Sequence, residues 1–160
     1  MIEPQIVQVP EKRLVGAHLS MSFTNFRIAE LWQSFIPKKH LITMAAGTDM
    51  ISMAIYKPDH FAQFNPANEF EKWAAIEVTS FENIPDGLSS FTVPAGLYAV
   101  FHYTGLNTDN SIYQYIFSSW LPTSGYELDQ RPHFEVLGEK YKNNDPNSEE
   151  DIYIPVRAAN

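Results

Sequence analysis

The stretch AELWQSFIP at residues 29–37 decides the fold, because it returns in altered form as QYIFSSWLP at residues 114–122. In each stretch the apolar residues recur at three- and four-residue spacing, which is typical of an amphipathic helix, and each ends in proline, which is expected to stop it. We therefore expect helices over residues 26–35 and from about residue 108 to residue 120. The repetition predicts a chain built from two similar halves.

Strand patterns surround both expected helices in the same order. Short apolar or alternating runs, bounded by proline, glycine and asparagine, predict strands. They lie at residues 6–9, 14–19, 50–56, 73–80, 88–93, 97–103, 131–137 and 151–157. Each half then reads strand, helix, strand, strand, with repeat one at about residues 1–82 and repeat two at about residues 88–157.

One such unit has a single helix on a small sheet and could not bury both its helix stripe and its sheet face. We therefore expect the repeats to pair into one α+β domain over residues 1–160, with two helices and a groove between the halves. Clefts between structural halves are common places for small-molecule sites. The alternative is that the nine-residue similarity is a coincidence.

Composition narrows the classes of function. Apolar residues make up 44% and aromatic residues 14%, which suffices to fill a core and to line a cavity. A formal net charge of −8 repels phosphate backbones and argues against direct nucleic-acid binding. The absence of cysteine excludes disulfides and thiolate chemistry. No apolar run suits a signal peptide or a membrane span, so we expect a cytoplasmic protein without membrane contact.

Glu135 is the polar residue that stands out, because it lies in the otherwise apolar strand RPHFEVL at residues 131–137. Strand alternation places His133 and Glu135 on one face and Phe134 and Val136 on the other. If the Glu135 face points into the groove, the carboxylate is desolvated and either takes up a proton or pairs with a cation. The alternative is that Glu135 lies on a solvated face.

Aromatic side chains are the second candidate feature, because ring faces attract cations and stack on planar ligands. Those on elements that could face one cavity include Trp73, Tyr98, Trp120, Tyr126 and Tyr153, although core packing could account for most of them. The histidines show no metal-binding spacing, and no nucleophile elbow, phosphate-binding loop or dinucleotide fingerprint is present. We therefore expect neither a metal nor a cofactor.

Four motifs of the second half resemble the GyrI-like family. They are VPAGLYAVF at residues 93–101, WLPxxGY at 120–126, RPxFE at 131–135 and EDIYIPV at 150–156. The duplicated first half extends the resemblance over essentially the whole chain. That family supplies the effector-binding domains of AraC-type and MerR-type multidrug regulators and also occurs as free-standing domains. The resemblance implies a pseudo-symmetric antiparallel sheet with two helices and a central ligand groove.

The resemblance also implies roles for particular residues. It implies that Glu135 engages cationic or electrophilic ligands and that Tyr153 borders the same cavity. Regulators of the family carry a helix-turn-helix portion before the ligand domain, whereas here the first expected strand starts close to Met1. We therefore expect a free-standing domain whose part in transcription would require a separate DNA-binding partner.

Three functions follow, of which we favour the first. It is the binding of hydrophobic, often cationic, small molecules by Glu135 and His133 together with the aromatic side chains of Trp73, Tyr98, Trp120, Tyr126 and Tyr153. The second is hydrolysis of electrophilic, cyclopropane-type compounds, in which Glu135 is the catalytic residue that activates water. The third is a protein partnership, with topoisomerase inhibited or protected by this chain, as the resemblance implies.

Overall fold

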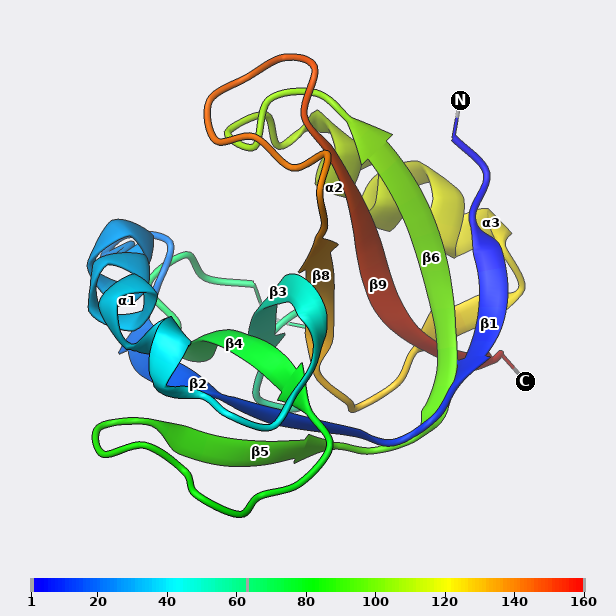
Figure 1. The fold of residues 1–160 in the computed structure, drawn as a ribbon. Coiled ribbons are helices and arrows are strands. Elements are labelled where there is room, and N and C mark those ends of the chain that lie inside the picture. The colour runs from blue at the N-terminus through cyan, green and yellow to red at the C-terminus, as the bar shows by residue number, and fades with distance from the viewer. Residues whose placement is uncertain (1, 63, 160) are drawn as a thin grey trace.

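A computed structural model describes residues 2–62 and 64–159 of the chain, and Figure 1 shows its course. The elements are, in chain order, β1 (Gln5–Val9), β2 (Lys12–Met21), α1 (Ile28–Phe35), the 3-10 helix η1 (Ile36–Leu41), β3 (Ala45–Ile55), β4 (Phe70–Val78), β5 (Ser89–Val93), β6 (Gly96–Thr104), α2 (Ser111–Tyr115), the π-helix η2 (Ile116–Trp120), α3 (Leu121–Thr123), β7 (Tyr126–Leu128), β8 (His133–Leu137) and β9 (Glu149–Ala158).

The strands form one antiparallel sheet whose order is symmetric about its centre. The order is β1-β6-β9-β8-β3-β4-β2-β5, and β7 pairs with β9 beside this path. The central pair joins β3 to β8, with Ser52 opposite Glu135. Moving outward, β4 and β2 follow on one side, and β9 and β6 follow on the other. The α+β class and the strand, helix, strand, strand order of both halves are therefore confirmed.

The two outermost strands, β1 and β5, are exchanged between the halves. β1 precedes the first half in sequence but pairs with β6 of the second half. β5 precedes the second half but pairs with β2 of the first half. The outer edge of each half is therefore a strand that lies beside the other half in the sequence. This exchange joins the two halves in addition to the central pair of β3 and β8.

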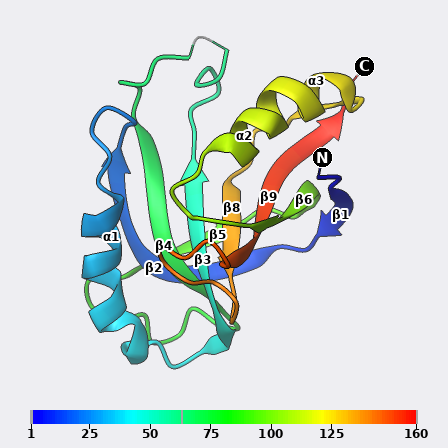
Figure 2. The same cartoon turned by 90° about the horizontal axis from the view of Figure 1, so that it is seen from above.

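Both helices cover the same face of the sheet, which we call the helix face. Ala54 of β3 packs in the apolar cluster beneath α1, and Ser52, two residues earlier, shares its face. The row through Ser52 and Glu135 continues to Ile152, which packs in the cluster beneath α2. In Figure 2, α1 lies along β2 and β4, whereas the α2–α3 segment lies beside β8 and β9.

The opposite face carries a third apolar cluster, to which both halves contribute. Its buried members include Met53 and Trp73 from the first half and Tyr98 and Phe134 from the second. The strand alternation that puts polar residues at the centre of the helix face therefore puts large apolar residues behind them. This third cluster gives the central strands a packed support.

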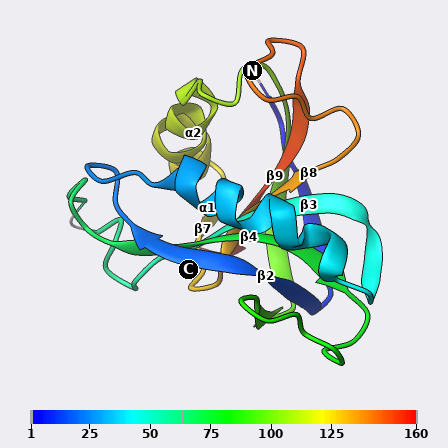
Figure 3. The same cartoon turned by 60° about the vertical axis from the view of Figure 1, so that its left-hand side comes forward.

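Proline does not end either helix in the way the sequence suggested. Beyond Phe35 the chain continues as η1, with Pro37 in its first turn, and Pro122 lies in the first turn of α3. Proline is tolerated there because its missing N–H would have no partner within the helix. Figure 3 shows α1 and its continuation running along the first-half strands.

Other boundaries also differ from the expectation. β3 begins at Ala45, ahead of the expected Met50, and the short β7 was not expected. Both departures lie where tertiary pairing decides the conformation, since Ala45 lies opposite Val78 across a register shift and β7 pairs with β9. Within residues 2–62 and 64–159, the helices lack the length and apolarity required to cross a bilayer.

Candidate functional site

Polar and ionisable side chains collect at the centre of the helix face, between the two helices. β8 contributes His133 and Glu135, and β4 contributes Lys72, which lies opposite Ala54, the register partner of His133. β9 contributes Glu150, which shares its face with Ile152, the register partner of Glu135. We call Lys72, Tyr113, His133, Glu135 and Glu150 the central cluster, with Tyr113 reaching it from α2.

Glu135 lies on this half-buried face and accepts a hydrogen bond from the hydroxyl of Tyr113. Burial raises the pKa of Tyr113 well above its ordinary value, and the Glu135 charge adds to the effect. The phenol therefore keeps its proton and remains a donor. The hydrogen bond joins the central strand β8 to α2, so the carboxylate is held in a defined place rather than extended into solvent.

Glu150 is a second carboxyl group of the cluster, which the sequence reading missed. Its residue is 8% exposed, and its Oε2 atom has no hydrogen-bond partner within the described residues. Burial, together with the neighbouring Glu135 charge, raises the pKa of Glu150 to about 9. At neutral pH the pair therefore holds one proton and one negative charge.

Aromatic rings from both halves surround His133. Phe61, from the turn after β3, stacks on His133 at a centroid distance of 5.7 Å, and Tyr56 meets the imidazole edge-on at 4.9 Å. Phe117 of η2 stacks on Phe61 at 5.3 Å. Burial lowers the pKa of His133 to about 3, so its imidazole is neutral at physiological pH. We call Tyr56, Phe61, Phe117 and His133 the aromatic group.

The π-helix η2 places Phe117 in this group. A π-turn inserts an extra residue into a helix and often occurs at functional sites. Here it lets Ile116 pack into the apolar cluster beneath α2 while Phe117 turns toward Phe61. No sequence signal distinguished this segment from an ordinary α-helix.

A cavity of about 240 Å³ opens beside the aromatic group. Its walls include Tyr56, Phe61 and His133 on one side and Asp129, Gln130, Arg131 and Arg157 on the other. Glu135 lies two residues beyond His133 on the same face of β8. The cavity therefore leads from the surface to the edge of the central cluster.

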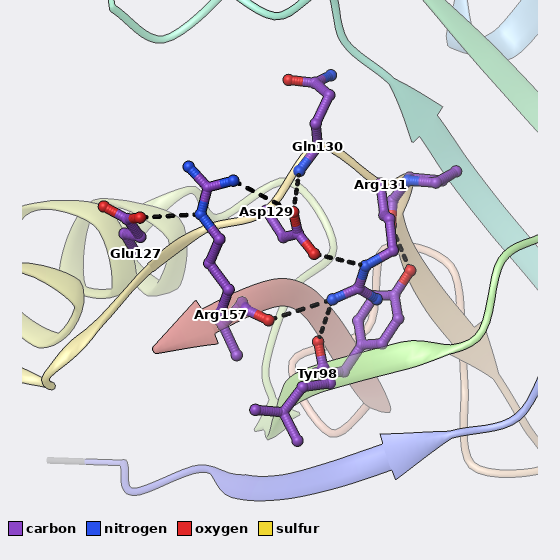
Figure 4. Close-up of polar contacts among 9 residues, drawn as sticks. Tyr98, Glu127, Asp129, Gln130, Arg131 and Arg157 are labelled. Carbon is purple, nitrogen blue, oxygen red and sulfur yellow. Dashed lines mark hydrogen bonds and ion pairs between the residues drawn. The ribbon is translucent and has the colours of Figure 1, made fainter. Parts of the chain in front are cut away.

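Arg131 fixes the segment that enters β8, as Figure 4 shows. Its Nη2 atom donates to the carbonyl oxygens of Leu97 and Val156 at 2.6 and 3.2 Å, and its guanidinium lies 4.7 Å from the ring centroid of Tyr98. A side chain at Gly96 would collide with the guanidinium, which explains a glycine at that position. This anchoring holds β8, and hence Glu135, in register.

Asp129 and Glu127 neutralise the two arginines at the rim of the cavity. Asp129 accepts from Arg131 Nε at 3.0 Å and lies 3.6 Å from Arg157 Nη1. Glu127 accepts from Arg157 Nε at 2.8 Å (Figure 4). These ion pairs offset the charges of the two arginines, while Lys57 adds a further cationic side chain to the lining of the cavity.

The structure does not bring Trp73, Tyr98 and Tyr153 together with Glu135. All three lie on the opposite face, where Tyr153 stacks on Phe134 at 4.4 Å and Tyr98 donates a hydrogen bond to the Pro132 carbonyl oxygen at 2.8 Å. The physical reason is strand alternation, because Tyr153 lies opposite Phe134 in register whereas Ile152 lies opposite Glu135. Tyr153 instead lines a separate cavity of about 290 Å³ on that face.

Trp120 and Tyr126 pack into the apolar cluster of the second half. Trp120 meets Phe101 edge-on at 5.2 Å and stacks on Tyr126 at 6.4 Å. Their rings thus join η2 and β7 to the sheet. Of the seven predicted ligand residues, the structure brings only Glu135 and His133 together in the central cluster.

The remaining cluster residues left weak signals in the sequence. Lys72 shares its face of β4 with Phe70 and Ala74, and Glu150 shares its face of β9 with Ile152 and Ile154. Each is therefore an ionisable residue on an otherwise apolar strand face. Tyr113 precedes the repeated helix segment by one position. Lys72 and Glu150 therefore carry the same sequence signal as Glu135, which is an ionisable side chain among apolar residues of a strand.

Comparisons with known proteins place this geometry in context. The Cass2 family model, described as integron-associated effector binding protein, matches residues 5–156. The transcriptional regulator BrlR of Pseudomonas aeruginosa is 32% identical over 154 residues, which cover 95% of this chain and 54% of that protein. The chain thus spans about half the length of this relative.

Several solved structures share the fold. SAV2435 bound to tetraphenylphosphonium superposes with a TM-score of 0.75 at 16% identity, covering 97% of this chain and 94% of that chain. The EcmrR C-terminal domain gives a TM-score of 0.71 at 14% identity and 99% coverage of both chains. An integron cassette protein of Vibrio cholerae gives 0.67 at 14% identity, covering 97% and 96%. At these identities the likeness concerns the fold, and it agrees with the GyrI-like effector-binding architecture expected from the motifs.

Proposed function

The chain belongs to the family of integron-associated effector-binding proteins, and we propose that it binds hydrophobic small molecules, cationic ones among them, at the central cluster of the helix face. Glu135 supplies the negative charge in this proposal, and the aromatic group supplies the surfaces on which a ligand stacks. The domain holds its ligand without transforming it.

The observation that carries this proposal is the setting of Glu135. Its carboxylate lies half-buried on a central strand, is held by the Tyr113 hydroxyl, and lies two residues from His133, which lines a cavity together with Tyr56 and Phe61. A half-buried carboxylate has lost part of its hydration, and a cation that stacks on nearby rings while pairing with the charge offsets that loss. Both halves contribute side chains to this site, as expected for a groove between two repeats.

The structural likeness supports the choice of probe. SAV2435 has been solved with tetraphenylphosphonium bound, and that ion combines one positive charge with four aromatic rings. Its dimensions exceed the present cavity, so we expect the rings of the aromatic group to move apart when it enters. Tetraphenylphosphonium is therefore a suitable first ligand for this chain.

The test is a calorimetric titration of the wild-type protein and of Glu135→Gln with tetraphenylphosphonium. We expect the affinity to fall at least about tenfold, since the substitution removes a unit charge from a partly buried site. Because Glu150 can lose its proton once Glu135 is neutral, the double variant Glu135→Gln/Glu150→Gln should lose more affinity than either single variant.

Glu77→Gln serves as the matched control, because it also removes one negative charge. Glu77 borders the cavity of the opposite face, where it pairs with Lys12 at 3.3 Å. This control should bind the probe like the wild type. Equal loss of affinity in Glu77→Gln and Glu135→Gln would point to the net charge of the protein and refute the proposed place of binding.

A second candidate function is hydrolysis of an electrophilic ligand in the same place. The specific observation is that a protonated carboxyl group, Glu150, lies beside the Tyr113–Glu135 pair. In that case Glu135 would orient and deprotonate water, while Glu150 would give its proton to the leaving group. Incubation with a cyclopropane-containing alkylating compound, followed by mass spectrometry, separates the two functions, because a binder yields no product above the buffer background.

Ligand occupancy could also serve transcription. BrlR is a transcriptional regulator, and an EcmrR–DNA complex shares this fold over 99% of the present chain with a TM-score of 0.70. We propose that the domain reports ligand binding to a DNA-binding protein. Its formal charge of −8 gives it no affinity of its own for phosphate backbones in this proposal.

A further inference from the structure

Lys72 is the positively charged member of the central cluster, and its position is unusual for a lysine. It lies on β4 between Phe70 and Ala74, both buried in the apolar cluster beneath α1. In register it lies opposite Ala54, which in turn lies opposite His133. The stem of Lys72 therefore runs along an apolar stripe, and its ammonium group faces the middle of the helix face.

Lys72 lies near two carboxyl groups but makes no direct ion pair with either of them. Within residues 2–62 and 64–159, no carboxylate oxygen lies within 4.0 Å of Lys72 Nζ, although Glu135 and Glu150 are both close enough to influence its pKa. Burial lowers the pKa of Lys72, and the two carboxyl groups oppose that effect. A long side chain without a fixed partner can move its charge when a ligand enters.

A charge count shows what this arrangement does. The cluster holds one basic side chain, Lys72, and two carboxyl groups, of which Glu150 is protonated at neutral pH because burial and the Glu135 charge together raise its pKa to about 9. Tyr113 keeps its proton and His133 is neutral. In the absence of ligand the site therefore sets one basic side chain against one ionised carboxylate. An entering cation would add a positive charge that the unliganded site does not balance.

Resting on the binding function proposed above, we infer that Lys72 is a specificity residue of the site: its ammonium group is the internal counter-cation of Glu135, and a ligand cation must compete with it. Neutral hydrophobic compounds meet no such competition. The wild-type site therefore accepts both classes, but it binds a neutral compound better, relative to a cation of the same shape, than a site without Lys72 would.

The experiment compares two probes of related shape on matched variants. The probes are tetraphenylphosphonium, which carries one positive charge, and triphenylphosphine oxide, which is neutral. Lys72→Met removes the ammonium group and keeps an unbranched apolar stem, whereas Lys39→Met removes one positive charge from η1, outside the site. Lys72→Gln is a second variant in case the methionine alters the packing.

We expect Lys72→Met and Lys72→Gln to bind tetraphenylphosphonium at least about tenfold more tightly than the wild type, because a like charge near the ligand has been removed. Their affinity for triphenylphosphine oxide should not rise, because this neutral probe carries no charge for Lys72 to repel and its phosphoryl oxygen loses a possible hydrogen-bond donor. Lys39→Met should match the wild type with both probes.

Two results would overturn the inference, and they are distinguishable. Equal affinity for tetraphenylphosphonium in the wild type and both Lys72 variants would refute the role of Lys72 and leave the binding function intact. Failure of every protein to bind either probe would refute the binding function and the inference together. Thermal unfolding of each variant shows that the compared proteins are folded.

Discussion

At the scale of single residues, the account depends on two carboxyl groups that share one proton. Glu135 and Glu150 lie on adjacent strands and on the same face, so ionising both would bring two negative charges together in a desolvated place. Burial and the Glu135 charge raise the pKa of Glu150 to about 9, so Glu150 stays protonated at neutral pH. A ligand cation opposes that protonation, since its positive charge stabilises the ionised form of Glu150.

Cation binding should therefore release a proton from Glu150. At pH 7 we expect release of up to about one proton per bound tetraphenylphosphonium, and we expect the affinity to rise as the pH approaches 9 because the unliganded site becomes more negative. Calorimetry in buffers of different ionisation enthalpy measures the number of protons. The groups that face Glu150 and could also contribute are Lys72, Tyr103, Tyr113, Glu135, Tyr141 and Asp151.

Glu150→Gln identifies the source of the proton. It should bind the cation with much less proton release, while Lys72→Met should keep the release because its carboxyl pair is intact. If Glu150→Gln released as many protons as the wild type, another group would be the source of the proton, and the protonated state assigned to Glu150 would be wrong.

At the scale of elements, the π-helix η2 directs two of its aromatic side chains to different parts of the molecule. Trp120 anchors its end to Phe101 and Tyr126, whereas Phe117 turns toward Phe61 in the aromatic group. A substitution at one position should therefore affect stability, and a substitution at the other should affect the ligand.

We expect Trp120→Ala to lower the free energy of unfolding by ~3 kcal/mol, because a large ring is removed from an apolar cluster, and to leave tetraphenylphosphonium binding within error of the wild type. Phe117→Ala should instead weaken binding by ~5-fold or more, as loss of one stacking ring does, with a smaller cost in stability. Urea titration and calorimetry measure the two quantities. An unchanged affinity in Phe117→Ala would remove the aromatic group from the site.

The elements also show which parts of the fold could be predicted from the sequence. Both helices and every strand except β7 could be predicted, because their apolar spacing is regular and is reinforced by the repeat. The continuation past Pro37 could not be predicted, since proline both ends helices and starts them. Likewise, the π-turn that places Phe117 leaves no pattern of its own, because it depends on packing against Phe61.

At the scale of the whole molecule, the pseudo-twofold arrangement positions the site. The central pair of β3 and β8 lies between the two helices, and the exchanged strands β1 and β5 tie each half to the other. Members of the central cluster come from β4, α2, β8 and β9, so neither half contains the site by itself. The candidate site therefore lies at the junction of the two repeats.

The candidate site could be predicted only in part at this scale. Glu135 was found because a carboxylate in an apolar strand is conspicuous, and the repeat supplied a groove for it to face. Tyr98, Trp73 and Tyr153 were grouped with Glu135 because aromatic residues suit cations, but the register of β8 and β9 puts Tyr153 behind the sheet. Register depends on long-range pairing, which a single sequence does not display.

The most direct test of the central claim is a crystal structure of the protein with tetraphenylphosphonium bound. The account predicts the phosphonium on the helix face, near the Glu135 carboxylate, with its rings among Tyr56, Phe61 and Phe117. A phosphonium bound on the opposite face, against Tyr153 in the cavity shared with Lys12 and Glu77, would contradict the account.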